Sequence, residues 1–162
     1  MRHAPGDPYT AKTNSDVIVS QSFNAGATWS APTPLQLPGD QFMPWGVYDT
    51  AGHLRIGMFD RSVDPANHKY GYSLATETVA GTLAFTTAVI STATSDPTTS
   101  DLWFARTVNP AFPFATAFLG DYSNIAATAD GGVVAYWTDM RNDSTFAGRT
   151  GHGEDAFFAK TS

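Results

Sequence analysis

The sequence predicts an all-β protein built from antiparallel sheets. Short runs of alternating apolar and polar residues recur along the chain, and glycine and proline, 14 and 10 of 162 residues, separate them. No stretch has the period of a long amphipathic helix. Apolar residues make up 42% of the chain and aromatic residues 13%, which is enough for one packed core. We therefore expect a single domain, residues 1–162, of many short strands.

The first element, residues 14–40, is expected to be the end of one sheet, with a tight turn between two strands. These strands are expected at 16–22 and 28–35. In the turn, Asn24 is suited to accept hydrogen bonds from backbone N–H groups two residues on, and Gly26 to supply a positive φ. The Thr28 hydroxyl is expected to close the turn. Trp29 has a large apolar body, so we expect it to be buried against a neighbouring sheet.

The second element, residues 41–95, has the pattern of a complete four-stranded sheet. Its strands are expected at 43–50, 53–60, 69–77 and 84–92. The turn before the last strand keeps a glycine, Gly81, and an aromatic residue, Phe85, and it looks like a decayed copy of the first turn.

The third element, residues 121–162, repeats part of the second. Residues 44–61 align with 123–141 at an offset of 79 residues. Each segment consists of a strand, a glycine turn and a second strand. An aspartate and an arginine close each segment. The strands of this incomplete sheet are expected at 122–129, 132–138 and 155–161. The polar, glycine-rich stretch 142–154 is interpreted as a mobile surface loop.

A long connection, residues 96–120, separates the second and third elements. Its prolines exclude it from the interior of a sheet. Its aromatic residues Phe112, Phe114 and Phe118 either form a platform on which sugars stack or cap the adjacent sheet, and capping is the favoured interpretation.

Four-stranded antiparallel sheets arranged around an axis form a β-propeller, and the chain has about two to two and a half such blades. The first and last sheets of a partial propeller would expose apolar faces and unpaired strand edges. The remaining blades are therefore expected from a longer parent chain, from another chain or from self-association, with a longer parent chain as the favoured source.

Composition excludes several kinds of function. The net charge is −6 and the nine basic residues are scattered singly, which argues against binding to nucleic acids or anionic membranes. No window is long and apolar enough for a membrane span. The chain has no cysteine, so disulfides, thiolate zinc sites and cysteine nucleophiles are excluded. Its four histidines have no metal-ligand spacing, and we expect neither a metal nor a cofactor.

The turn Ser22–Trp29 resembles the Asp-box, Ser-x-Asp-x-Gly-x-Thr-Trp, with Asn24 in place of the aspartate. Further matching segments are 41–45, 59–61, 64–67, 118–122 and 137–141. With these segments the chain, from residue 14 to 162, resembles secreted bacterial proteins of the sialidase-like superfamily, the BNR or Asp-box repeat proteins. The resemblance implies the C-terminal part of a six-bladed propeller. It also implies an extracellular protein, whose signal lies outside this chain, and a glycan or glycoprotein as partner.

The resemblance suggests site residues as well. Sialidases use a tyrosine nucleophile in a Tyr-Ser-x-apolar stretch, which Tyr122-Ser123-Asn124-Ile125 matches; a structural tyrosine at a strand start is the alternative. Arg106 is the only arginine between Arg61 and Tyr122, so it is the candidate for the last arginine that binds the sugar carboxylate. No glutamate matches the partner of the tyrosine. The other candidates for substrate contact are Asp60, Arg61, Asp121, Asp139 and Arg141.

Two interpretations of these candidates stay open. The aspartate and arginine that close each repeated hairpin either contact a ligand or form a repeated structural ion pair or turn cap, and the structural role is favoured. Two functions stay open too. One is a glycoside hydrolase-like segment, an exo-sialidase only as part of a complete propeller. The alternative is a non-catalytic propeller module that binds glycans or proteins or supports a larger assembly.

Overall fold

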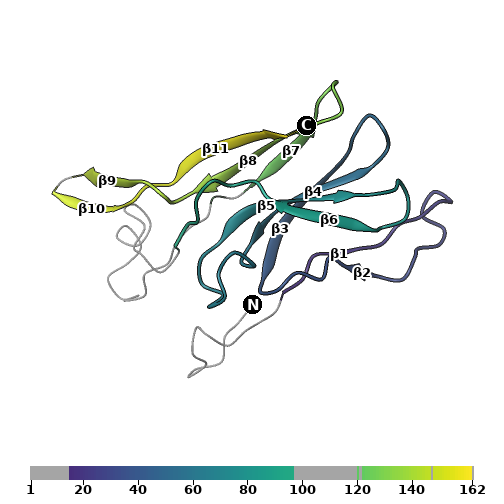
Figure 1. Ribbon diagram of the computed structural model, residues 1–162, viewed down its shortest axis with the longest axis horizontal. Coiled ribbons are helices and arrows are strands. Elements are labelled where there is room, and N and C mark those ends of the chain that lie inside the picture. The colour runs from purple at the N-terminus through teal and green to yellow at the C-terminus, as the bar shows by residue number, and fades with distance from the viewer. Residues whose placement is uncertain (1–14, 97–119, 121, 147, 162) are drawn as a thin grey trace.

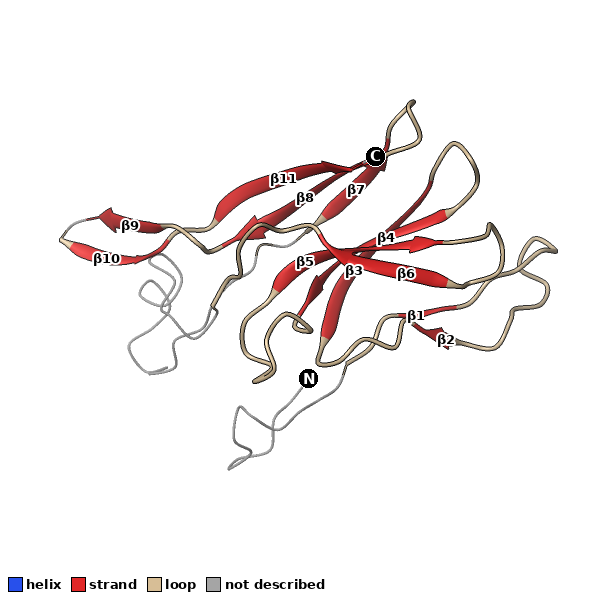
Figure 2. Ribbon diagram, in the orientation of Figure 1, coloured by secondary structure: helices blue, strands red, loops and turns tan. Residues whose placement is uncertain are grey.

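The computed structural model describes residues 15–96, 120, 122–146 and 148–161. Every regular element in these residues is a strand, and all strands pair antiparallel (Figure 2). The predicted all-β class is therefore confirmed. None of the described segments forms a helix long and apolar enough to cross a membrane.

Four sheets make up the described fold. The first is the short pair β1 (Ile18–Val19) and β2 (Thr33–Pro34). The central sheet has the order β3 (Gln41–Tyr48), β4 (Leu54–Asp60), β5 (Gly71–Glu77) and β6 (Phe85–Val89). The third sheet has the order β7 (Asn124–Ala127), β8 (Val133–Asp139) and β11 (Asp155–Thr161). The last is the hairpin of β9 (Asp143–Phe146) and β10 (Arg149–His152).

The β9–β10 hairpin corrects one sequence-based expectation. Residues 142–154 are predicted as a loop, but they contain a ladder that pairs Arg149 with Phe146 and His152 with Asp143. The hydroxyls of Thr145 and Thr150 lie 2.9 Å apart across this ladder. Its described side chains are mostly exposed. A strand with no buried face does not need alternating apolar residues, so the usual sequence pattern is missing.

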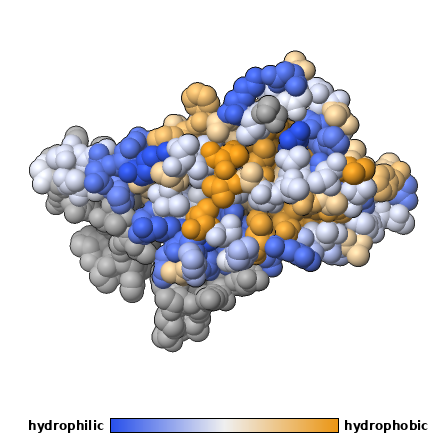
Figure 3. Space-filling model, viewed as in Figure 1, coloured by the Kyte–Doolittle hydropathy of each residue, from blue (hydrophilic) through white to orange (hydrophobic). Residues whose placement is uncertain are grey.

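The first three sheets pack face to face, with the central sheet in the middle (Figure 1). One face of the central sheet packs Ile56, Met58 and Ala75 against Val17 beside β1. The opposite face packs Phe59, Tyr72 and Leu74 against the third sheet, where the partners are Ile125, Val133, Ala135 and Trp137. Apolar residues also gather across the middle of the face in Figure 3. Burial on both faces explains the continuous buried run in β4.

Aromatic rings form the contact between the two larger sheets. Phe59 meets the Tyr72 ring edge-on at 5.3 Å, and Tyr72 stacks on Trp137 at 4.9 Å with nearly parallel planes. Burial raises the pKa of Tyr72 to about 12. Gly57 allows this close approach, since a Cβ there would lie 2.5 Å from Ile125 Cγ2.

The predicted 79-residue repeat is present in the backbone. The amide of Asp49 donates to the His53 carbonyl at 3.0 Å, and in the third sheet Thr128 donates to Gly132 at 2.9 Å. The turn glycine Gly52 has a φ of 83°, and its equivalent, Gly131, has 87°.

Each of these sheets turns the same face toward the sheet before it. Met58 of the central sheet faces β1 and β2, and its equivalent Trp137 faces the central sheet.

The turn 22–29 is closed by side chains. Asn24 Oδ1 accepts from the Thr28 amide at 2.9 Å, and Asn24 Nδ2 donates to Thr28 Oγ1 at 2.8 Å. The Ser22 hydroxyl accepts from the Gly26 amide at 2.8 Å, and Gly26 has a φ of 86°. The expected roles of Gly26 and Thr28 are confirmed, but Asn24 reaches the amide four residues on rather than two.

The expectation that Trp29 is buried against a sheet is wrong, because 64% of this residue is exposed. The first two strands pack on the central sheet through Val17, Val19, Leu35 and Leu37. Trp29 belongs to the turn beyond these contacts, so none of the described sheets covers its indole.

Replacing Gly57 with alanine is expected to lower the free energy of unfolding by about 1–3 kcal/mol, the range for overpacking a core. The added methyl would lie 2.5 Å from Ile125 Cγ2 and 2.7 Å from the Tyr72 hydroxyl, so the sheets must move apart. Urea denaturation measures the change. Gly46→Ala is the control, because its nearest neighbour would be 3.6 Å away. An equal loss in both variants would contradict the close contact.

Candidate functional site

The stack of sheets has two different ends. The turn end consists of the turns 22–29, 49–53, 78–84 and 128–132. The loop end consists of the β4–β5 connection and the starts of β3 and β7. Contacts between the sheets at both ends show that they run in the same direction: Ser123 Oγ donates to the Met43 carbonyl at 3.2 Å, and Arg55 Nη2 to the Gly131 carbonyl at 3.5 Å.

The described candidates from the sequence therefore gather at the loop end of the central and third sheets. They are Asp60, Arg61, Tyr122, Asp139 and Arg141. Arg106 and Asp121 lie outside the described residues, as do Phe112, Phe114 and Phe118.

Asp60 is a saturated acceptor. It is buried, and Oδ1 accepts from the Ser62 amide at 2.8 Å and from Gln41 Nε2 at 3.2 Å. Oδ2 accepts from the hydroxyls of Ser62 at 2.6 Å and Ser73 at 2.7 Å. A carboxylate accepts about four hydrogen bonds, so no acceptor position remains for a ligand. Asp60 acts as a cap for the turn after β4.

Asp139 has the equivalent role in the third sheet. Its Oδ1 accepts from the Arg141 amide at 2.9 Å, as Asp60 does from Ser62, and from Arg141 Nε at 2.8 Å. Its Oδ2 accepts from Arg141 Nη2 at 2.6 Å and from Trp137 Nε1 at 3.2 Å. Burial opposes ionisation of Asp139, but these hydrogen bonds outweigh it and lower its pKa.

Arg141 is held as firmly as Asp139. Its guanidinium lies 4.1 Å from the centre of the Phe157 ring, and Nη1 donates to Thr92 Oγ1 at 2.6 Å. The hydrogen bond to Asp139 raises the pKa of Arg141. This geometry supports the interpretation of Asp60, Asp139 and Arg141 as structural residues.

Arg61 is placed differently, because it does not pair with Asp60. Its Nη1 donates to Asp40 Oδ2 at 3.2 Å, and its guanidinium lies 5.5 Å from the centre of the Phe42 ring. Within the part of the chain that the structure describes, Arg61 Nε is buried without a hydrogen-bond partner. Arg61 lines a recess of about 430 Å³, together with Ser62, Asp64 and Asn67.

Sequence reasoning missed Asp40 and Asn67, which hold Arg61 in place. Asp40 is buried, and its Oδ2 accepts from Asn67 Nδ2 at 2.9 Å as well as from Arg61. The Asp40 amide donates back to Asn67 Oδ1 at 2.9 Å. Gly39 stands next to Asp40 in the sequence, but a single glycine does not indicate that Asn67 approaches it. Gly39 has a φ of 73°, and a Cβ there would lie 2.7 Å from Asn67 Oδ1.

Asp64 shapes the wall of the recess. Its carboxylate accepts from the backbone amides of Lys69 at 2.8 Å, and of Ala66 and His68 at 3.0 Å. These hydrogen bonds, that of Lys69 first, lower the pKa of Asp64. The recess is therefore lined by a paired cation, a carboxylate, an amide and a hydroxyl, which is a mixture of donors and acceptors.

Tyr122 is 76% exposed at the start of β7. The next residue, Ser123, is buried and hydrogen-bonded to the start of β3, so Tyr122 lies beside the starts of two strands.

No group of three metal-ligating side chains occurs among the described residues. Comparisons of the chain with protein-family models, with curated proteins and with solved structures returned no match.

Asp139→Asn is expected to lower the free energy of unfolding at neutral pH by about 2 kcal/mol, the size of hydrogen bonds to a charged group. The folded pKa of Asp139 lies below its ordinary value. Its carboxylate therefore stabilises the fold fully above about pH 4, and this contribution disappears as the pH falls further. Denaturation of both proteins from neutral to acid pH should show the difference shrink.

Asp130→Asn is the matched control. Asp130 also has a lowered pKa, through Lys160 at 2.6 Å, but both side chains are more than half exposed. Solvent screens such a pair, so its loss should matter much less. Equal losses in the two variants would contradict the role of burial.

Proposed function

We propose that the chain is a non-catalytic segment of a sialidase-like β-propeller that binds glycans at its loop end. The observation that carries this proposal is the recess beside Arg61, where a fixed guanidinium, an amide, a carboxylate and a hydroxyl face one small volume. Sugars present many hydroxyl groups, each a donor and an acceptor, so a mixed set of polar groups suits them.

The repeated stacking supports the propeller part of the proposal. Three sheets follow one another, and the two larger ones each turn the equivalent face toward their predecessor. The outer face of the third sheet exposes Tyr136, 48%, and Phe158, 71%. Tyr136 is the 79-residue equivalent of Gly57, on a face that the central sheet buries. We propose that a further antiparallel sheet covers this face in the complete propeller, which is also proposed to be extracellular.

The charges around Arg61 favour neutral sugars over acidic ones. Asp40 already balances the guanidinium at 3.2 Å, and Asp64 adds a second carboxylate to the wall. An anionic sugar would therefore enter a recess whose net charge is negative. Arg61 is therefore not proposed to have the carboxylate-binding role that the family resemblance suggests for arginines.

Arg61→Gln is expected to weaken binding of a neutral oligosaccharide at the loop end by about tenfold, the loss of one charge-assisted hydrogen bond. Titration calorimetry with lactose and 3′-sialyllactose measures it, and sialyllactose should bind no more tightly than lactose. Lys69→Gln is the control, because it removes the same charge from the same connection without changing the recess. A clear preference for sialyllactose would contradict the neutral-sugar proposal.

Hydrolysis is the second candidate, favoured by the exposure of Tyr122 at the same end. We nevertheless expect no hydrolysis of a fluorogenic sialoside by this chain. Asp60 and Asp139 have no acceptor position left, and Glu77 accepts the amides of Leu54 and Leu83 at the turn end. Measurable hydrolysis that disappears in Tyr122→Phe would contradict the binding-only role and support catalysis.

A further inference from the structure

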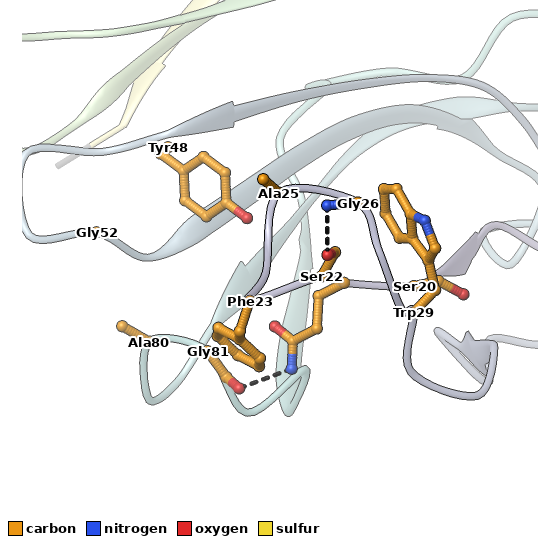
Figure 4. Close-up of a pocket in the computed structure, with 11 residues that line it drawn as sticks. Ser20, Ser22, Phe23, Ala25, Gly26, Trp29, Tyr48, Gly52, Ala80 and Gly81 are labelled. Carbon is orange, nitrogen blue, oxygen red and sulfur yellow. Dashed lines mark hydrogen bonds between the residues drawn. The ribbon is translucent and has the colours of Figure 1, made fainter.

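An open groove of about 760 Å³ lies at the turn end, opposite the recess beside Arg61 (Figure 4). The turn 22–29, the end of β3 and the β5–β6 turn form its walls. Three exposed rings line it: Phe23, 81% exposed, Trp29, 64%, and Tyr48, 61%. Figure 4 shows Tyr48 on one side of the turn and Trp29 on the other, with Phe23 beside Gly81.

Among the residues that the structure describes, none with a charged side chain lines this groove, although the whole chain has a net charge of −6. The side-chain polar groups of the lining residues are uncharged: the hydroxyls of Ser20, Ser22 and Tyr48, the amide of Gln21 and the indole N–H of Trp29. Phosphate and carboxylate ligands need cationic partners, which this lining lacks. The composition therefore selects a neutral ligand with both apolar and hydroxyl surfaces.

The walls of the groove are fixed before any ligand arrives. Gln21 Nε2 donates to the Gly81 carbonyl at 2.8 Å, which ties the turn 22–29 to the β5–β6 turn. The Phe23 ring packs over Gly81, where a Cβ would lie 3.5 Å from Cζ. The internal hydrogen bonds of Asn24 and Ser22 hold the turn itself. A preformed site loses little conformational entropy on binding.

We propose that this groove is a second glycan site, which binds a neutral oligosaccharide by stacking sugar rings on Trp29 and Phe23. A pyranose ring presents a face of C–H bonds, and the negative face of an aromatic ring attracts such groups while apolar surface is buried. Sugar hydroxyls then bond to the hydroxyls of Tyr48 and Ser20. The inference does not depend on the loop-end function, because the two sites share no residue.

The test titrates the whole chain with hexaoses of glucose, N-acetylglucosamine, xylose and mannose while tryptophan fluorescence is recorded. At least one should shift the emission, because Trp29 lines the groove, whereas Trp137 is buried and Trp45 is not among the described lining residues. Titration calorimetry with that hexaose, which does not need the Trp29 reporter, should show that Trp29→Ala and Phe23→Ala each weaken the binding by about tenfold or more. Phe158→Ala, an equally exposed ring on the third sheet, is the matched control and should bind normally.

Arg61→Gln separates this site from the proposed loop-end function, because it should leave the fluorescence response unchanged. Circular dichroism of Trp29→Ala should match the parent, since the indole belongs to neither buried core cluster. Three outcomes would overturn the inference. The first is no response to any hexaose at about 10 mM. The second is binding by Trp29→Ala and by Phe23→Ala that is as tight as binding by the parent. The third is self-association that depends on Trp29, which would identify a second copy as the occupant.

Discussion

The close contact between the central and third sheets is the interaction on which the structure depends. Gly57 allows Ile125 and Tyr72 to approach the strand, and Tyr72 in turn stacks on Trp137. The first two strands cover the other face of the central sheet, so side chains on both of its faces are removed from water. Contacts at the two ends set the three sheets in one direction, and this common direction separates the loop end from the turn end.

Polar side chains at the loop end are dictated by this burial. Where a strand covered on both faces ends, its backbone amides still need hydrogen-bond acceptors. The carboxylate of Asp60 accepts the amide of Ser62 after β4, and the carboxylate of Asp139 accepts the amide of Arg141 after β8. The repetition identifies these aspartates as parts of the architecture. Arg61 departs from the repeat by turning to Asp40, so the recess is particular to one sheet.

The strands of the central and third sheets are predicted to within three residues at each end, but those expected at 16–22 and 28–35 shrink to Ile18–Val19 and Thr33–Pro34. The last strand is expected at 155–161 and is found there, and the repeated glycine turns are found at Gly52 and Gly131, both with a positive φ. The β9–β10 hairpin escapes prediction because no face of it needs apolar residues. The pairing of Arg61 with Asp40 spans 21 residues and has no local signature. Exposure of Trp29 depends on which sheets are neighbours, which a single turn motif does not encode.

The β9–β10 hairpin has a wider consequence. It stands between two paired strands, yet the register of β8 and β11 runs unbroken from Asp139 opposite Asp155 to Val133 opposite Thr161. A segment can therefore be lengthened here without disturbing the ladder behind it. This connection is a natural place for evolution, or for an engineer, to graft new recognition loops while the scaffold stays intact.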